Sequence, residues 1–107
     1  MAKWYDIAVQ NLDQGDEISK SYPLKLNDKN GYLLFSNKKV LFVHGEGLLR
    51  KKYELTFELP YEKIESVSKT GQYELDITDV EGGRHSIKTF EISASRIEEN
   101  FKTIPAA

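Results

Sequence analysis

Residues 52–59 read KYELTFEL, an unbroken alternation of polar and apolar side chains. A period of two places alternate side chains on opposite faces of a β-strand, so this stretch predicts a strand with one buried face. Because proline has no backbone N–H to donate to a strand ladder, Pro60 is expected to end the strand. The predicted buried face carries Tyr53, Leu55, Phe57 and Leu59.

Six further segments have the composition of strands. Polar or glycine-containing turns separate them, most clearly at Asn27–Gly31 and Glu81–Gly83. Residues 32–35 and 40–43 are apolar throughout, which predicts strands that are buried on both faces or close a barrel. The first strand should place Ile18, Tyr22, Leu24 and Leu26 on one face. The six strands are predicted at residues 17–26, 32–35, 40–43, 64–68, 73–78 and 85–90.

A helix is predicted after the last strand. Either Ser93 or Ser95 can cap its N-terminus, and Glu98 lies in capping-box position after Ser95. Pro105 marks the end of the helix. Four apolar residues with helical spacing define its buried face, namely Ala94, Ile97, Phe101 and Ile104.

A short helix is also predicted ahead of the strands, ending near Gly15. Trp4 either packs under the core as an apolar plug or stays exposed at a dimer contact, and we expect burial. The apolar face of this helix would consist of Trp4, Ile7, Ala8 and Leu12.

A chain of 107 residues fits one domain. We assign residues 1–14 to an N-terminal segment and residues 15–105 to the domain proper. An open sheet of seven short strands would expose two edges, whereas closure with a helix over one opening hides the edges and creates a core. The sequence therefore predicts a mainly β fold, a seven-stranded barrel capped by the C-terminal helix.

The composition of the chain argues against several classes of function. Fifteen basic and seventeen acidic side chains give a net charge of −2, so no nucleic-acid partner is expected. The chain contains no cysteine, which excludes disulfides and thiolate metal sites, and a cytoplasmic location is the expectation. We find no leader-like segment at the start and no apolar run of about 18 residues, the length needed to span a membrane.

The residue pattern does not indicate catalysis. His44 and His85 have no metal-ligand spacing to each other, and neither a Gly-x-Ser-x-Gly motif nor a phosphate loop occurs. The strand carboxylates fall at solvent-facing positions, where solvation explains them. We therefore expect no enzyme activity, no catalytic residue, no metal and no cofactor.

Two segments resemble the pleckstrin-homology-like (PH-like) superfamily. Residues Gly31–Val43, with Ser36-Asn37-Lys38-Lys39 between two apolar runs, resemble a hairpin of GRAM and of bacterial or archaeal PH-like domains. Residues Leu59–Val67 are similar to the segment that follows in those families. The resemblance implies a barrel of two near-orthogonal antiparallel sheets and a role as an interaction module.

Two binding surfaces are candidates. A basic rim for anionic lipid headgroups would consist of Lys38, Lys39, Arg50, Lys51 and Lys52, although lysines also protect strand ends from aggregation. A groove for an extended peptide, between the helix and the fifth strand, would be lined by Glu65, Ser66, Ser68, Lys69, Arg96, Glu99 and Asn100.

The second predicted strand lacks the basic residues of phosphoinositide-binding members, which favours a protein partner over a lipid. The leading hypothesis is therefore a non-catalytic PH-like adaptor. A narrower version, implied by resemblance to GLUE domains, has ubiquitin as the partner. The alternative is a peripheral membrane module that binds anionic headgroups through the basic rim.

Overall fold

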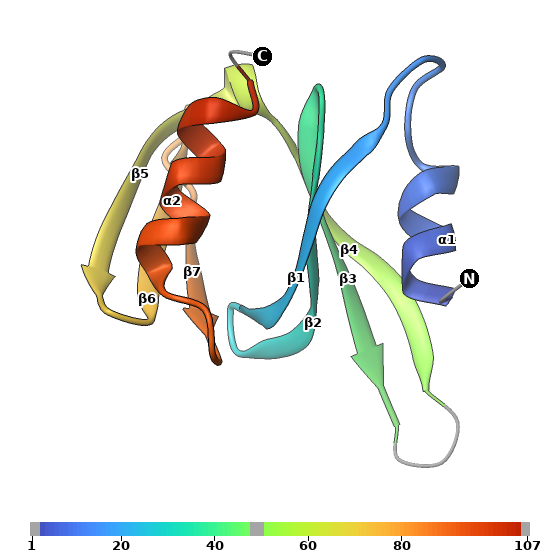
Figure 1. Ribbon diagram of the computed structural model, residues 1–107, viewed down its shortest axis with the longest axis horizontal. Coiled ribbons are helices and arrows are strands. Elements are labelled where there is room, and N and C mark those ends of the chain that lie inside the picture. Colours follow the sequence, from blue (N-terminus) through green and yellow to red (C-terminus); the bar gives the residue numbers. More distant parts are fainter. Residues whose placement is uncertain (1–2, 48–50, 106–107) are drawn as a thin grey trace.

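The described strands form one antiparallel sheet flanked by two helices (Figure 1). The computed structural model describes residues 3–47 and 51–105. Strands follow the order β4-β3-β2-β1-β7-β6-β5, which confirms the seven predicted strands. The strands are β1 Ile18–Leu26, β2 Lys29–Ser36, β3 Lys39–Glu46, β4 Lys52–Pro60, β5 Ile64–Gly71, β6 Glu74–Asp79 and β7 Arg84–Thr89. The helices are α1 Lys3–Gln10, the single 3-10 turn η1 Tyr61–Lys63 and α2 Ala94–Thr103.

The predicted closed barrel is wrong. The described strands make a single sheet with β4 and β5 at its two ends, and β1 pairs with both β2 and β7 rather than belonging to one of two separate sheets. The turn η1 leads directly from β4 to β5, and α2 packs against β5 and β6. Side chains of α2 therefore cover the main apolar cluster from the β5–β6 side.

The main apolar cluster lies between the sheet and α2. The rings of Phe35 and Phe101 meet edge-on with their centroids 4.9 Å apart. Because Ala94, Ile97 and Phe101 are buried and Ile104 packs against the cluster, the predicted buried face of the helix is confirmed. The buried members of this main cluster are Tyr22, Leu24, Leu26, Leu33, Phe35, Val40, Phe42, Leu59, Leu75, Ile77, Ile87, Ala94, Ile97 and Phe101.

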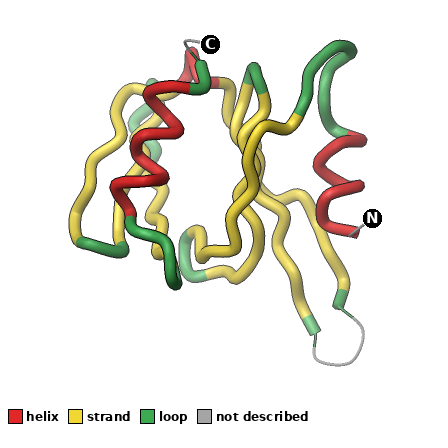
Figure 2. Tube along the Cα trace, in the orientation of Figure 1, coloured by secondary structure: helices red, strands yellow, loops and turns green. Residues whose placement is uncertain are grey.

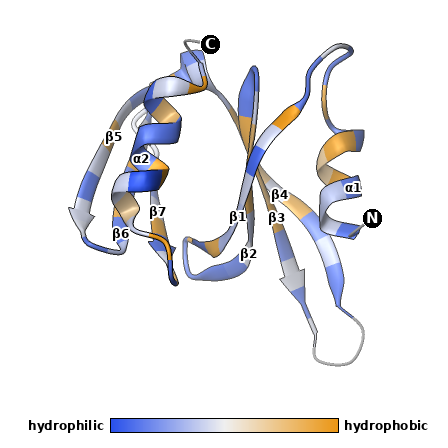
Figure 3. Ribbon diagram, in the orientation of Figure 1, coloured by the Kyte–Doolittle hydropathy of each residue, from blue (hydrophilic) through white to orange (hydrophobic). Residues whose placement is uncertain are grey.

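Of the two residues predicted as N-cap of α2, one is found in the structure. Ser93 occupies the N-cap position, so the alternative capping box of Ser95 and Glu98 is wrong. Glu98 instead forms an ion pair with Lys102, one turn later, at 3.6 Å between Oε1 and Nζ. Along the ribbon of this helix, hydrophilic residues are interspersed with the hydrophobic residues of its buried face (Figure 3).

A second apolar cluster lies on the opposite face of β2, β3 and β4, beneath α1, so the two helices flank the strands from opposite sides (Figure 2). Trp4 stacks on Tyr32 with ring centroids 3.9 Å apart and planes inclined by 7°. Trp4 is half-buried there, so it is neither a plug beneath the main cluster nor fully exposed. We call this the α1 cluster; Ala8, Leu34 and Val43 are buried, and Trp4, Tyr5, Ile7, Ile18, Tyr32, Tyr53 and Leu55 are partly buried.

A β-bulge in β4 divides its apolar residues between the two clusters. Phe42 pairs with Phe57, but the next residue, Val43, pairs with Leu55, which leaves Thr56 as an extra residue. Phe57 therefore packs against the main cluster and Leu55 against the α1 cluster. The prediction that Tyr53, Leu55, Phe57 and Leu59 share one face is wrong, because an inserted residue shifts the two-residue period by one step.

The first strand contains a similar bulge. Ile18 pairs with Ser36 and Lys20 pairs with Phe35, so Ser19 is the extra residue. Ile18 joins the α1 cluster, whereas Tyr22, Leu24 and Leu26 face the main cluster. With helices on both sides, the central strands β2 and β3 are buried on both faces, as predicted for residues 32–35 and 40–43.

Candidate functional site

The predicted basic rim is not assembled. Lys39 begins β3, whereas Lys52 pairs with Glu46 at the far end of the same strand. Seven residue steps at about 3.3 Å per residue separate these two ends by about 23 Å. Lys38 lies at the first end and Lys51 at the second, and Arg50 lies outside the described residues. A single headgroup site cannot use both ends at once.

Lys39 has a structural role. Its ammonium group donates to the Asn11 carbonyl at 2.7 Å and to Glu58 Oε2 at 3.1 Å, and its side chain is only 11% exposed. The side chain therefore links the segment after α1 to both β3 and β4. It is not available to a headgroup without losing these bonds.

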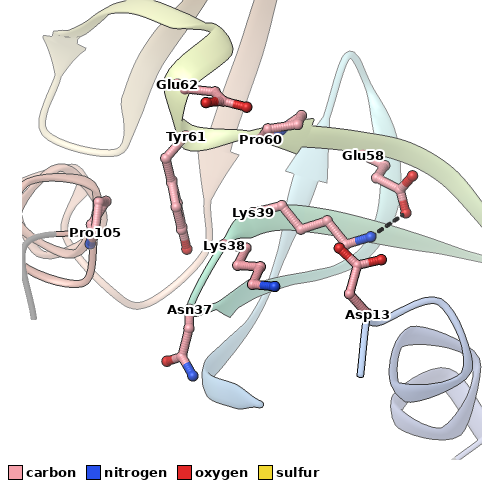
Figure 4. Close-up of a pocket in the computed structure, with 9 residues that line it drawn as sticks. All are labelled: Asp13, Asn37, Lys38, Lys39, Glu58, Pro60, Tyr61, Glu62 and Pro105. Carbon is pink, nitrogen blue, oxygen red and sulfur yellow. Dashed lines mark hydrogen bonds and ion pairs between the residues drawn. The ribbon is translucent and has the colours of Figure 1, made fainter. Parts of the chain in front are cut away.

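A hollow of about 470 Å³ lies beside Lys38 and Lys39, which we call the β2–β3 hollow. Figure 4 shows the two lysines, Asp13 and Glu58 gathered on one side of it and Tyr61 and Glu62 on the other. Three carboxylates line the space against two ammonium groups, so its charge does not favour an anion. The lining residues are Asp13, Asn37, Lys38, Lys39, Glu58, Pro60, Tyr61, Glu62 and Pro105.

Hydrogen bonds beneath this hollow give the segment Ser36-Asn37-Lys38-Lys39 a structural role in the β2–β3 turn. The Ser36 hydroxyl donates to Asp16 Oδ2 at 2.7 Å and accepts from the Lys39 amide at 3.1 Å. Asp16 Oδ1 accepts from the Asn37 amide at 2.8 Å. The motif thus closes the β2–β3 turn and fastens the N-terminal segment to it.

Tyr61 belongs to the same arrangement. Its hydroxyl donates to the Ser36 carbonyl at 2.7 Å. Burial, and secondarily the negative charge of Asp16, raises the pKa of the Tyr61 phenol. The phenol therefore remains a hydrogen-bond donor throughout the neutral range and has no acid–base role there.

The predicted groove between β5 and α2 is not built from the expected residues. Val67 pairs with the fully buried Ile77 and faces the main cluster. Its neighbours Ser66 and Ser68 therefore point to the opposite face of the sheet, away from α2. Glu65 and Lys69 are exposed near the two bulges of β5.

The helix residues predicted for that groove do not share one face of α2. Asn100 donates to the Tyr22 hydroxyl at 2.6 Å, which places it on the flank of α2 that faces β1. Arg96 is four residues earlier and shares that flank, whereas Glu99 points to solvent. A peptide-binding role for these residues stays a prediction, but the structure does not bring them together with the β5 residues.

A second hollow, of about 600 Å³, lies at the other end of β3, and sequence reasoning did not identify it. Aromatic and proline side chains form much of its lining, so we call it the aromatic hollow. Phe90, one of its residues, is 52% exposed. The lining residues are Pro23, Asn30, Gly31, Tyr32, His44, Gly45, Glu46, Gly47, Lys51, Tyr53 and Phe90.

Two glycines of the lining allow close packing of their neighbours. A Cβ on Gly31 would overlap the Val43 carbonyl oxygen and lie 2.6 Å from Phe42 Cζ. A Cβ on Gly45 would lie 2.8 Å from Tyr53 Cε1, because the Tyr53 ring packs directly over the Gly45 backbone. Both strands can approach their neighbours here only because these positions have no side chain.

Two rings of the hollow, Tyr32 and Tyr53, are held by packing. Trp4 stacks on Tyr32 and restricts its ring, while Tyr53 packs against Gly45. His44 Nδ1 lies 2.7 Å from the Asn30 carbonyl, which orients the imidazole. These three rings are therefore restricted before any partner binds, which favours binding because less side-chain freedom is lost.

The remaining histidine stabilises a turn. His85 Nε2 lies 3.1 Å from Asp79 Oδ2, and Asp79 Oδ1 accepts from the amides of Glu81 and Gly83. The hydrogen bond from His85, followed by that from the Gly83 amide, lowers the pKa of the Asp79 carboxyl. Within the described ranges, no cluster of three metal-ligating side chains occurs, and no helix is long and apolar enough to cross a membrane.

The order of seven antiparallel strands followed by a helix over the open side of the sheet defines a PH-like domain, a class whose members generally bind other molecules rather than catalyse. A family model described as "Bacterial PH domain" matches residues 12–105, and the chain belongs to this family. The matched part begins after α1.

A solved structure shares the fold. It is the crystal structure of the C-terminal domain of an unknown protein from Leishmania infantum, with a TM-score of 0.61 and 13% sequence identity. The match covers 94% of this chain and 90% of the other. At this level of identity the likeness concerns the fold alone. No curated protein matches the sequence significantly.

Proposed function

We propose that this PH-like domain is a non-catalytic adaptor that binds a protein partner at the aromatic hollow. The observation that carries the proposal is the set of partly exposed rings, Tyr32, Tyr53 and Phe90, around a hollow of about 600 Å³. Aromatic side chains contribute more than most residues to protein–protein binding, because they offer a large rigid surface with few rotatable bonds.

The contrast with the β2–β3 hollow supports this choice of site. There, Lys39 is already bonded to Glu58 and Asn11, and a partner would have to break those contacts. In the aromatic hollow, Phe90 belongs to neither apolar cluster as the structure describes them, so a partner could cover it without rearranging the core. Burying an exposed apolar side chain favours association.

Two narrower versions of this function differ in the partner. Ubiquitin is the protein partner implied by the resemblance to GLUE domains. The lipid alternative now depends on Lys51 and Lys52 at the end of the β3–β4 hairpin, since Lys38 and Lys39 lie at the opposite end of β3. Electrostatic attachment to an anionic membrane would weaken as salt screens it.

An affinity capture with matched variants tests the proposal. Wild-type protein and two charge variants, Phe90→Asp in the hollow and Tyr73→Asp outside it, would be presented to an extract of the source cells. Tyr73 is a suitable control because it is 43% exposed and does not line the hollow. We expect the capture to recover a protein that binds the wild type and Tyr73→Asp but does not bind Phe90→Asp.

Two further measurements separate the narrower versions. Titration with purified ubiquitin would shift the amide signals of Gly31 and Gly45 if ubiquitin is the partner. Co-sedimentation with phosphatidylserine vesicles at low and high salt tests the lipid alternative. Salt-sensitive vesicle binding that Phe90→Asp leaves intact, with no protein lost from the capture, would refute the proposal.

A further inference from the structure

The face of β2, β3 and β4 that is turned away from the main cluster carries a continuous apolar surface. Tyr32 of β2 pairs with Val43 of β3, and Val43 pairs with Leu55 of β4, so these three side chains form one row across the strands. Leu34 lies two residues from Tyr32 on the same face and is fully buried, as is Val43. The helix α1 therefore rests on a surface that three strands build together.

The same face of the other half of the sheet is polar. Ser68 pairs with Asp76, and Asp76 pairs with Ser86, in a row across β5, β6 and β7. Glu74 and Lys88 pair beside this row, and both are exposed. Because a large apolar patch on the outside of a domain marks an interaction site, the difference between the two halves points to a docking surface beneath α1.

The family match separates this surface from the helix that covers it. The matched residues, 12–105, include every sheet residue of the α1 cluster, whereas α1 ends at Gln10. The PH-like domain itself therefore builds the apolar surface, and α1 is a separate segment that occupies it.

Apolar contacts hold α1 on the sheet. Within the described part of the chain, residues 3–10 make no hydrogen bond or ion pair to a strand, and the nearest polar contact to the sheet lies one residue beyond the helix, from the Lys39 ammonium group to the Asn11 carbonyl at 2.7 Å. Apolar contacts are not directional, so another amphipathic helix can replace them.

The cover that α1 provides is incomplete. Its eight residues include one fully buried side chain, Ala8, while Ile7 is half-buried. On the sheet, Tyr53 and Leu55 also stay half-buried. Isolated helices shorter than about 12–15 residues are marginal in water, so α1 depends on this surface for its structure. A longer helix would bury more of the same surface.

The contacts of α1 show which side chains the surface accepts. Trp4 stacks on Tyr32 with ring centroids 3.9 Å apart, and Ala8, one turn later, is fully buried. Ile7 packs against the same cluster. An aromatic residue followed three and four positions later by an aliphatic and a small residue places all three on one face of a helix. Recognition of such a face in an apolar groove is an established way for proteins to bind a helix.

A partner helix fits the surface better than α1 of a second copy. The α1 of another molecule would make only the contacts already present, and it would compete with a tethered helix whose effective concentration is on the order of millimolar. A longer partner helix gains additional buried area and can displace α1.

We propose that the outer face of β2, β3 and β4 is a docking site for an amphipathic helix of a partner protein, and that α1 occupies this site in the free chain. The partner helix carries an aromatic, an aliphatic and a small residue at the spacing of Trp4, Ile7 and Ala8. The inference goes beyond the proposed function, because it assigns a second surface with a ligand of its own.

The probe is a fluorescein-labelled helical peptide of about 18 residues, long enough to be helical in water. It places tryptophan, isoleucine and alanine at that spacing on a background of glutamate, lysine and glutamine. A control peptide has the same composition, with the three residues spread around the helix. Fluorescence anisotropy with the full chain should show saturable binding of the first peptide and at least tenfold weaker binding of the second.

Substitutions within α1 test whether it competes for the site. Ile7→Glu places a charge in the α1 cluster and should release α1, and Val9→Glu is the matched control because Val9 is 43% exposed. The apparent affinity scales with the fraction of chains whose site is open. Ile7→Glu should therefore lower the dissociation constant of the peptide at least fivefold, and Val9→Glu should leave it unchanged. Trp4→Ala, which removes the stack on Tyr32, is a second variant with the same expected direction.

Three outcomes would overturn the inference. The first is that neither Ile7→Glu nor Trp4→Ala binds the peptide more tightly than the wild type, although circular dichroism shows that both are folded. The second is equal affinity for the two peptides, which would mean non-specific apolar contact. The third is a wild-type dimer in sedimentation equilibrium that Ile7→Glu abolishes, which would assign the surface to α1 of a second copy.

Discussion

The two apolar clusters of this domain differ in how completely they exclude water. The main cluster contains large side chains from both halves of the sheet and from α2, and Phe35, Phe42 and Ile97 are fully buried. The α1 cluster buries only Ala8, Leu34 and Val43, and its aromatic members remain partly exposed. Since burial of apolar surface is the dominant stabilising term, the first cluster should hold the fold and the second should hold only α1 in place.

The aromatic hollow borders the less protected cluster. Tyr32 and Tyr53 belong to the α1 cluster and also line the hollow. Their partial exposure weakens the packing of α1, yet it leaves their rings accessible to a partner. Surface that a partner could bind is therefore available where the packing of the α1 cluster is incomplete.

The largest expected effect comes from the main cluster. Phe35→Ala should lower the free energy of unfolding by about 3–5 kcal/mol, because it removes a fully buried ring that contacts the rings of Tyr22 and Phe101. Urea unfolding followed by circular dichroism measures the change. Phe90→Ala is the matched control and should stay within about 0.5 kcal/mol of wild type. Similar losses for both variants would contradict the assigned core.

Deletion of Thr56 tests the division between the clusters. Because Thr56 is the extra residue, its deletion leaves Leu55 directly before Phe57, and alternation keeps the two on opposite faces, as they are now. We expect a loss of less than about 1 kcal/mol. Deletion of Glu54 is the contrast, because it moves Tyr53 to the opposite face and out of the α1 cluster, and it should cost about 1–3 kcal/mol. Urea unfolding measures both variants. Equal losses for the two deletions would show that Thr56 is not the inserted residue.

Trp4→Ala should affect the α1 cluster alone. We expect a loss of about 1–2 kcal/mol, because the half-buried ring stacks on Tyr32. Hydrogen exchange should show faster exchange of the α1 amides with unchanged protection in β6 and β7. The neighbouring exposed position provides the control Val9→Ala. Uniform acceleration across the sheet would mean that the two clusters unfold as one unit.

The smallest effect concerns the β6–β7 turn and appears only in acid. The pKa of Asp79 is lowered below its ordinary value of 3.8, mainly by the hydrogen bond from His85. A carboxyl with a depressed folded pKa adds stability above the unfolded pKa, and this contribution is lost as pH falls through the folded pKa. Asp79→Asn should therefore flatten the decline in urea midpoint below about pH 4. If the urea midpoint of Asp79→Asn declines in acid as steeply as that of wild type, Asp79 does not cause the decline.

Local patterns predicted most of the elements. The seven strands, the buried face of α2 and a short N-terminal helix all follow from periodicity and from turn residues such as Asn27 and Gly82. Local patterns did not predict how the apolar residues of β4 are divided between the two clusters, because nothing in KYELTFEL marks Thr56 as an inserted residue. The same limit applies to Ile18 in β1.

The candidate sites were harder to predict than the elements. Sequence proximity grouped Lys38 and Lys39 with Lys51 and Lys52, but an extended strand separates the two pairs. The aromatic hollow combines residues as distant as Pro23, Tyr53 and Phe90. Their meeting depends on strand register, which arises from the pairing of whole strands and has no local signature.

The sequence by itself determined where the chain forms strands and helices and which face of α2 is buried, because alternation and helical spacing act over a few residues. Only the tertiary structure decided that the sheet stays open beneath α2, which face each half of β4 presents, and which rings gather around one hollow. These features depend on bulges and on packing between distant segments, where a shift of one residue reverses the face of every side chain that follows.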